Sequence, residues 1–391
     1  MDHNQAISYV HDLLRRVIEL NASDLFVTVG APPSVKLNGV ITPLTSQALS
    51  QTHSEVLTRS IMNDKQLAEF ERCRENNFAI SLPGVARFRV NAFNQRGSVG
   101  MVLRLIRHDI PSFEELRLPP QLRELSMTKR GLIIFVGATS SGKSSSLAAM
   151  VGYRNANSQG HIVTIEDPIE FVHQHMKCIV TQREVGVDTE SYEVALKNTL
   201  RQAPDVILIG EVRDRETMGH AIAFAETGHL CLTTLHANNT NQALDRIINF
   251  FPEERRHQLL MDLSLNLKAV ISQRLVRRED GNGRVPAVEI LINTPLMADL
   301  IFDGKVHEMK DLIKRSREHG MQTFDQHLFD LYEAGLISFE EALRSADSVN
   351  DLRIAVKLNS KRGRTRDLLG ETDSMSIREE QASHGAGLML R

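Results

Sequence analysis

Residues 137–144 read Gly-Ala-Thr-Ser-Ser-Gly-Lys-Ser, which matches the phosphate-binding pattern G-x-x-x-x-G-K-[ST]. The apolar run at residues 132–136 precedes this pattern and predicts a buried strand, and the residues after it predict the start of a helix. A strand, a glycine-containing loop and a helix in this order form a cradle of backbone N–H groups that binds phosphates. The sequence therefore predicts an α/β domain built around a nucleotide-binding loop.

Each residue type in this loop has a chemical role. Gly137 and Gly142 permit the tight turn that aims backbone N–H groups inward. Lys143 would reach the β- and γ-phosphates, and the hydroxyl of Ser144 would ligate Mg²⁺. The predicted nucleotide-binding residues are Gly137, Ala138, Thr139, Ser140, Ser141, Gly142, Lys143, Ser144 and Ser145.

Length and composition bound the remaining possibilities. The chain has 391 residues, more than one hydrophobic core usually organises, so we expect two domains and a tail. A net charge of −3 argues against a protein that wraps DNA. No apolar run of about 18 residues and no signal-peptide pattern occurs, so we expect a cytosolic protein. The cysteines, Cys73, Cys178 and Cys231, form no C-x-x-C pair and are predicted to be reduced, packed thiols.

Residues 1–110 are predicted to form an α+β domain. Residues 5–20 have the 3.6-residue apolar period of an amphipathic helix, and helical patterning returns across residues 50–73. Alternating apolar runs between glycine and asparagine turns predict strands at residues 25–29, 34–38, 78–82, 86–93 and 99–106. Proline residues near position 111 and at 119–120 mark the passage to the next domain.

Residues 111–356 are predicted to form the nucleotide-binding domain, because strands alternate with helices as in a parallel sheet with crossovers. Helical periodicity at residues 255–275 and 323–356 predicts a helical C-terminal part. Residues 357–391 are poor in apolar side chains and are predicted to be a flexible polar tail. The predicted strands of the sheet are residues 132–136, 161–165, 178–180, 206–209 and 230–235.

Three acidic residues, Glu166, Asp167 and Glu170, follow the predicted strand at residues 161–165. Pro168 restricts the backbone between them, so we expect a fixed loop rather than a helix face. The carboxyl ends of parallel strands are where such sheets bind ligands. Carboxylates beside a phosphate would repel it without a cation, so we expect Mg²⁺, or water bound to it, at this loop.

A further carboxylate, Glu211, follows the predicted strand at residues 206–209. In P-loop hydrolases an acidic residue in this place orients water or metal near the γ-phosphate, so we expect Glu211 to polarise the attacking water. The next predicted strand ends at His236, which could sense the γ-phosphate by a hydrogen bond and signal to the following helix. A structural role is the alternative for His236.

Four segments, residues 137–144, 164–170, 210–214 and 225–236, occur in one order. They resemble the Walker A, Asp, Walker B and His boxes of secretion-type ATPases, and within these the PilT/PilU family of type IV pilus retraction ATPases. The likeness runs from residue 5 to about residue 350. It implies a PAS-like N-terminal domain, a RecA-like P-loop ATPase domain with a helical C-terminal part, and a hexamer that holds ATP and Mg²⁺ at its subunit boundaries.

The resemblance also assigns roles to single residues. Glu170 and Glu211 match the family's carboxylates that handle Mg²⁺ and water, with Ser144 and Glu170 as the metal-binding residues. His229 and His236 match its histidine pair, which adds both to the expected catalytic residues.

Arginines of the N-terminal domain supply positive charge to the nucleotide in this family. Arg89 and Arg104 are the best matches, and they complete the set of expected catalytic residues. Such arginines stabilise charge on the γ-phosphoryl group and can contribute about 10³–10⁵ in rate. Surface charges on edge strands are the alternative interpretation of both.

Two departures from the family's patterns indicate which branch of the family this chain resembles most. Secretion and pilus-extension ATPases commonly insert a four-cysteine zinc module, which this chain lacks, so retraction fits better than extension. PilT-type chains carry Ala-Ile-Arg-Asn-Leu-Ile-Arg-Glu where residues 295–304 here read Pro-Leu-Met-Ala-Asp-Leu-Ile-Phe-Asp-Gly, so the chain is more similar to the PilU branch. That likeness implies pilus retraction with a PilT-like motor ATPase, and a cytoplasmic position at the pilus base on an inner-membrane platform protein.

Three other functions stay open. A RecA-like DNA-dependent ATPase would share the loop and the acidic strand end, but the chain has no Trp and only four Tyr for stacking on bases, so we expect no nucleic-acid partner. A small-molecule P-loop kinase is disfavoured by the separate N-terminal domain. A non-hydrolysing or weakly hydrolysing accessory subunit of the same motor has the same sequence features as the motor itself.

Overall fold

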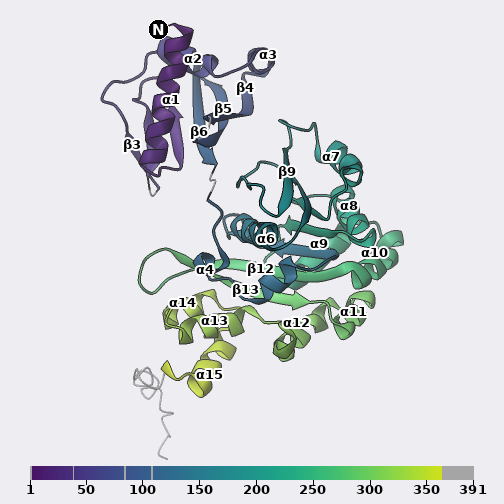
Figure 1. Cartoon of the computed structure of the whole chain (residues 1–391). Coiled ribbons are helices and arrows are strands. Elements are labelled where there is room, and N and C mark those ends of the chain that lie inside the picture. Colours follow the sequence, from purple (N-terminus) through teal and green to yellow (C-terminus); the bar gives the residue numbers. More distant parts are fainter. Residues whose placement is uncertain (1, 38, 83–84, 107–108, 363–391) are drawn as a thin grey trace, which may run out of the picture. The chain divides into compact units, whose positions relative to one another are not determined.

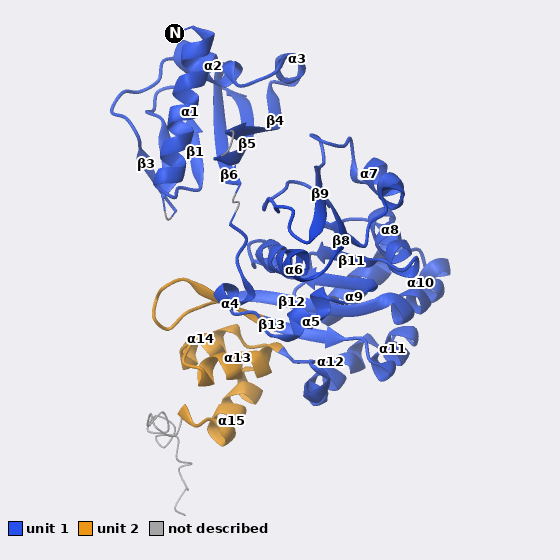
Figure 2. Ribbon diagram, viewed as in Figure 1, with its two compact units in different colours: residues 1–275, 288–323 blue, residues 276–287, 324–391 orange. Residues whose placement is uncertain are grey.

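The computed structural model describes residues 2–37, 39–82, 85–106 and 109–362 of the chain (Figure 1). The chain divides into two compact units (Figure 2). The first comprises residues 1–275 and 288–323, and the second comprises residues 276–287 and 324–391. Two sheets, one of six strands and one of seven, organise the described chain together with the helices, in agreement with the predicted α/β class.

The six-stranded sheet is formed by the N-terminal part of the chain and is antiparallel at each pairing. Its order is β3-β2-β1-β6-β5-β4, and the five strands predicted in this region are all present. The strands are β1 (Asp24–Val27), β2 (Ser34–Leu37), β3 (Val40–Pro43), β4 (Glu75–Leu82), β5 (Ala86–Gln95) and β6 (Ser98–Ile106).

Three helices accompany this sheet: α1 (His3–Glu19), α2 (Gln51–Ser60) and α3 (Asp64–Cys73). Asn63 divides the single helical region predicted at residues 50–73, because its side chain caps a new helix by accepting from the Gln66 N–H at 2.9 Å. Apolar residues of α1 and of the strands then form one core. From α1 these are Ala6, Val10, Leu13, Leu14 and Val17, spaced as expected for one helix face.

The seven-stranded sheet has the order β13-β12-β7-β11-β10-β8-β9. The strands β12, β7, β11, β10, β8 and β9 pair in parallel, so their carboxyl ends meet at one edge. The strands are β7 (Gly131–Val136), β8 (Gly160–Glu166), β9 (Cys178–Glu184), β10 (Val206–Ile209), β11 (Leu230–Leu235), β12 (Leu267–Arg277) and β13 (Arg284–Ile292).

Helices pack on both faces of this sheet, as the side chains of β7 show. Ile133 and Phe135 belong to the core under α4–α6, whereas Leu132, Ile134 and Val136 belong to the core under α7–α12. A central parallel strand buried on both faces needs this continuous apolar run. The helices are α4 (Phe113–Leu116), α5 (Gln121–Ser126), α6 (Lys143–Asn157), α7 (Tyr192–Thr199), α8 (Arg215–Glu226), α9 (Thr240–Phe250), α10 (Glu253–Asn266), α11 (Pro295–Phe302) and α12 (Val306–Arg315), with short 3₁₀ turns at Leu200–Gln202 and Arg317–His319.

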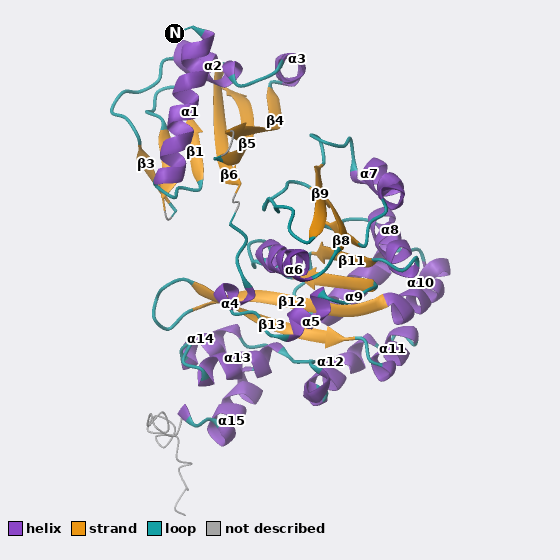
Figure 3. Cartoon of the chain, viewed as in Figure 1, coloured by secondary structure: helices purple, strands orange, loops and turns teal. Residues whose placement is uncertain are grey.

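The structure corrects the helical prediction at residues 255–275. Helix α10 ends at Asn266, and the chain continues as strand β12, which pairs with β7 (Figure 3). Strand β13 was not predicted at all. Residues 267–277 are buried at most positions, so they have no clear alternation, and a short apolar run without alternation does not distinguish a buried strand from a helix.

The second unit contains α13 (Phe324–Glu333), α14 (Phe339–Ser345) and α15 (Val349–Asn359), which confirms the helical prediction at residues 323–356. The predicted tail at residues 357–391 needs correction at its start, because α15 extends to Asn359 and Ser360 is buried. The rest of the predicted tail, residues 363–391, lies outside the described residues.

Cysteine and membrane predictions can also be compared with the structure. Cys178 and Cys231 are buried as predicted, but Cys73 is exposed at the end of α3 and is not a packed thiol. Among the described residues, no helix combines the length and the apolar character that crossing a bilayer requires.

Candidate functional site

The phosphate loop, defined here as residues 137–142, joins the end of β7 to the first residue of α6. Its two glycines have backbone angles that side chains disfavour, with φ of +154° at Gly137 and +85° at Gly142. A Cβ atom at Gly137 would lie 2.5 Å from the carbonyl oxygen of Gln273, and one at Gly142 would lie 2.8 Å from the Gln273 amide nitrogen. Both positions therefore require glycine, for conformation and for space.

Lys143 is buried at the N-terminus of α6, and its ammonium points back to the loop. The Nζ atom donates to the carbonyl oxygens of Gly137 and Ala138, each at 2.9 Å. Burial lowers the pKa of Lys143, and the nearby Glu170 carboxylate opposes this shift. The loop carbonyls hold the ammonium where phosphate oxygens would compete for it.

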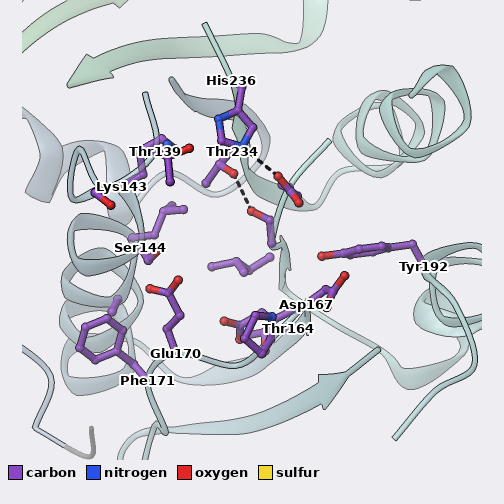
Figure 4. A pocket seen from close by; sticks show the side chains of 18 of the residues that line it. Thr139, Lys143, Ser144, Thr164, Asp167, Glu170, Phe171, Tyr192, Thr234 and His236 are labelled. Atoms are coloured by element: carbon purple, nitrogen blue, oxygen red, sulfur yellow. Dashed lines mark hydrogen bonds and ion pairs between the residues drawn. The ribbon is translucent and has the colours of Figure 1, made fainter. Parts of the chain in front are cut away.

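The acidic loop after β8 places its carboxylates around the same space, and Glu170 points into it from below Ser144 (Figure 4). Glu166 accepts hydrogen bonds from the Thr164 hydroxyl at 2.6 Å and from the Gln182 amide at 3.2 Å. Burial nevertheless raises the pKa of Glu166 to about 7. A carboxyl group that titrates near neutrality is suited to exchange a proton with water in this pocket.

Glu166→Gln is expected to remove a pH dependence of stability. Between about pH 4.5 and pH 7 the folded chain keeps a proton that the unfolded chain has lost, so stability falls as pH rises. Above pH 7 the penalty is complete, at about 3 kcal/mol. In urea unfolding, the variant should exceed the parent in stability at about pH 8 and equal it near pH 4.5.

Glu190→Gln, at an exposed position outside the pocket, is the matched control and should follow the parent. A constant stability difference between Glu166→Gln and the parent at both pH values would contradict the raised pKa.

Glu211 follows β10 and Gly210, and its side chain is only 14% exposed. The Nε2 atom of His236 donates to its carboxylate at 3.1 Å, because a carboxylate can only accept, and Arg213 forms an ion pair with it. Burial, with the charges of Lys143, Arg246 and Arg213, lowers the pKa of His236. A neutral His236 and a cationic Arg213 thus orient the Glu211 carboxylate from two sides.

These groups line one pocket of about 240 Å³ at the carboxyl edge of the sheet (Figure 4). Of the predicted site residues, it is lined by Thr139, Ser140, Lys143, Ser144, Glu170, Glu211 and His236. Gly137 and Ala138 line a neighbouring pocket that shares His236. Ser141 and Gly142 pack against Gln273, and Ser145 lies in the first turn of α6.

His229 does not line this pocket, although the family resemblance pairs it with His236. It precedes β11 and hydrogen-bonds within its own turn, with its ring nitrogen 3.0 Å from the Thr227 hydroxyl. His236 follows the other end of β11, and seven extended residues span about 23 Å. The two histidines therefore occupy opposite edges of one sheet, so His229 could approach a nucleotide only in another copy of the chain.

Arg89 and Arg104 lie on the six-stranded sheet, directly opposite each other on β5 and β6. Arg104 pairs with the buried Asp24 at 2.8 Å while its own side chain is 71% exposed. Among the described residues that line the nucleotide pocket of the same chain, neither arginine occurs.

Sequence reasoning missed two residues of the site, Gln273 and Tyr192. Gln273, from β12, bonds to the phosphate loop and to α6 through its side-chain amide. Tyr192, from α7, lines the pocket, and its buried hydroxyl has no hydrogen-bond partner among the described residues. Burial, together with the charge of Asp167, raises the pKa of Tyr192. No local signal marks either residue, because each belongs to an element distant in sequence from the loop.

The donor set fits Mg²⁺ together with a nucleotide. Ser144 offers a hydroxyl and Glu170 a carboxylate, both hard oxygen ligands. Within the described part of the chain, no group of three His, Cys, Asp or Glu side chains forms a metal site by itself. Mg²⁺ is usually bound by one or two such oxygens together with phosphate oxygens, so this sparse set is sufficient.

Comparisons with known proteins agree with this geometry. A family model described as Type II/IV secretion system protein matches residues 1–344. Type IV pilus ATPase PilU of Pseudomonas aeruginosa is 63% identical over 348 residues, which cover 89% of this chain and 91% of that protein. Type IV pilus retraction ATPase PilT of the same organism is 43% identical over 337 residues, which cover 86% of this chain and 98% of that protein.

Solved structures of ATPases are also similar to this chain. The structure of the pilus retraction motor PilT with bound ADP matches with a TM-score of 0.82 and 41% identity, covering 88% of this chain and 99% of that one. The ATPase DotB of Legionella pneumophila matches with a TM-score of 0.75 and 27% identity, covering 86% and 94%. The chain is thus an ATPase that belongs to the type II/IV secretion system protein family, with the pilus ATPases PilU and PilT among its relatives.

Proposed function

We propose that this chain is an ATP-hydrolysing motor of the type IV pilus machinery and that it works as a hexameric ring. We further propose that it drives or assists pilus retraction, and so twitching motility, together with a PilT-like motor ATPase. The names of the PilU and PilT relatives support the pilus assignment. The absence of arginine from residues 295–304, where PilT-type chains carry it, supports dependence on such a partner.

The same proposal includes the domain organisation of the chain and the location of the ring in the cell. Residues 1–110 would form a PAS-like domain and residues 111–356 a RecA-like ATPase domain with C-terminal helices. The separate antiparallel sheet with its own core supports the first assignment, and the parallel sheet with its phosphate loop supports the second. The ring would lie in the cytoplasm at the pilus base, against an inner-membrane platform protein.

One observation carries the proposal: the pocket has an excess of negative charge within its own chain. The carboxylates of Asp167, Glu170 and Glu211 line it, and Lys143 is the cationic side chain among its lining residues. Arg213 lies nearby but is already paired with Glu211. Phosphoryl transfer to water places further negative charge on the γ-phosphoryl group, which an arginine stabilises best because it stays protonated. Arg89 and Arg104 of a neighbouring copy would supply that charge.

The roles of the residues follow from their positions. The phosphate loop and the N-terminus of α6 would bind the phosphates through backbone N–H groups, and Lys143 would exchange its loop carbonyls for phosphate oxygens. Bound Mg²⁺ would neutralise phosphate charge, held by Ser144 and Glu170. Glu211, oriented by His236, would accept a hydrogen bond from the attacking water and polarise it.

Hydrolysis would become movement because the arginine contact depends on the γ-phosphate. While the γ-phosphate is present, the neighbour's arginines hold the boundary closed; once it leaves, that contact is lost and the boundary opens. Sequential opening around a ring would turn or push the platform protein.

Assembly gives the direct test. If the site is shared between copies, the ATPase rate per chain is expected to rise with protein concentration and to level off where mass determination shows complete rings. The measurement combines phosphate release with light-scattering mass across a dilution series. A rate per chain that stays constant from monomer to ring would reject a shared site.

A further inference from the structure

We propose that Gln273 is a positioning residue for the nucleotide: its side-chain amide sets the direction of the peptide bond between Ser141 and Gly142 in the phosphate loop. Gln273 lies on β12, the strand beside β7, and is 2% exposed. Its Nε2 donates to the Ser141 carbonyl oxygen at 2.8 Å, and its Oε1 accepts from the Ser146 hydroxyl at 2.8 Å. One side chain thus joins the loop to the first turn of α6.

The chemistry of the two partners determines how the amide must point. The Ser141 carbonyl can only accept, so it requires the NH₂ end of the amide. Ser146 then donates its hydroxyl hydrogen to the amide oxygen. Like Gln273, Ser146 is buried, with 1% of its surface exposed. The amide therefore has one consistent orientation, with neither end interchangeable.

This orientation bears on phosphate binding through peptide geometry. In a trans peptide the C=O of one residue and the N–H of the next point in opposite directions. Because Gln273 holds the Ser141 carbonyl on the β12 side of the loop, the N–H of Gly142 points to the other side, where the loop encloses phosphates. Rotation of this peptide would turn a carbonyl dipole toward the phosphates instead.

The two glycines of the phosphate loop lie so close to Gln273 that neither position has room for a side chain. A Cβ atom at Gly142 would meet the Gln273 amide at 2.8 Å, and one at Gly137 would meet the Gln273 main-chain oxygen at 2.5 Å. Both glycines of the phosphate pattern thus lie against one residue of β12. The adjacent Ser272 donates to the Asn238 carbonyl oxygen at 3.2 Å, so the same strand end also contacts the segment after His236.

Gln273→Glu is the most informative variant, because it keeps shape and changes one donor into an acceptor. At about pH 8 a carboxylate would face the Ser141 carbonyl, repel it and free the peptide to rotate. We expect the dissociation constant for Mg·ADP to rise about tenfold to a hundredfold, the effect of a lost hydrogen bond to a charged ligand. At about pH 5.5 the protonated carboxyl can donate again, and most of the affinity should return.

The readout is the ratio of variant to parent dissociation constants at each pH, measured with the full chain and a fluorescent ADP analogue. Both proteins contain the same titratable groups in the pocket, so the effects of these groups cancel in the ratio. They are Lys143, Glu166, Asp167, Glu170, His173, Tyr192, Glu211 and His236. Gln273→Met, of similar volume but without hydrogen bonds, is the control and should bind weakly at both pH values.

The inference rests on nucleotide binding by this loop and not on the proposed ring. A parent protein that fails to bind Mg·ADP would contradict the proposed function itself. With normal parent binding, equal affinity of Gln273→Glu and the parent at about pH 8, or a loss that is the same at both pH values, would overturn the inference. Should Gln273→Glu not fold, unchanged affinity of Gln273→Met would overturn it equally.

Discussion

Lys143→Ala is expected to lower the ATPase rate by at least about 10²–10³-fold, the usual effect of removing one group that stabilises charge in the transition state. The structure explains the size of the effect, because Lys143 is the cation that this chain itself presents to the pocket from the start of α6. Its two hydrogen bonds are to loop carbonyls, so the residue is held in place before any phosphate arrives. Phosphate release under saturating ATP is the measurement.

The exposed Lys129→Ala is the control for loss of one lysine, and its rate should equal that of the parent. Thermal unfolding of both variants separates loss of chemistry from loss of folding. If Lys143→Ala releases phosphate as fast as the parent, the pocket is not the hydrolytic site, and a non-hydrolysing accessory role would be favoured instead.

Arg89→Ala is expected to lower kcat by about 10³-fold or more, which is about 4 kcal/mol of transition-state stabilisation. Arg89 has no place in the pocket of its own chain, so the loss would come from the pocket of a neighbour. The preferred variant is Arg89→Ala rather than Arg104→Ala, because Arg104 pairs with Asp24, whose side chain is 5% exposed. Removing Arg104 would leave that carboxylate unpaired and would lower stability as well.

Mixing two inactive variants tests whether the arginine acts between copies. In an equal mixture of Arg89→Ala and Glu211→Ala chains, a site is complete when its own chain keeps Glu211 and its neighbour keeps Arg89. Random assembly into rings makes both conditions true at about a quarter of sites, so about a quarter of the parent rate should return.

Each variant alone, and a mixture of Lys143→Ala with Glu211→Ala, provide the controls. Lys143 and Glu211 belong to the part of the site that one chain contributes. In the mixture of Lys143→Ala with Glu211→Ala, every chain therefore lacks one of the two, and the rate should stay low. Equal rates in the two mixtures would show that Arg89 does not act across a boundary.

Local patterns predicted the parts of the site that are continuous in sequence. The run at residues 132–136, the phosphate loop and the start of α6 were all placed correctly, because a buried strand, a glycine turn and a helix N-terminus each have their own local signature. Glu211 at the end of β10 and His236 at the end of β11 follow from the same rule, that polar residues leaving parallel strands meet at one edge.

The secondary-structure prediction is wrong where the local pattern is ambiguous. The helical prediction at residues 267–275 is wrong because β12 is buried along most of its length and therefore lacks the alternation of a strand with one exposed face. The structure also shows that His229 and His236, which the resemblance pairs, lie at opposite ends of β11.

The amino-acid sequence by itself determined the phosphate loop, the strands β7, β8, β10 and β11 that end around it, and the family to which the chain belongs. Only the tertiary structure decided which distant residues complete the site: Gln273 against the phosphate loop and Tyr192 in the lining of the pocket. The physical reason is that the loop depends on angles and residue types that are adjacent in the chain. Contacts across a sheet depend instead on strand order and register, which the whole core sets by burying its apolar faces.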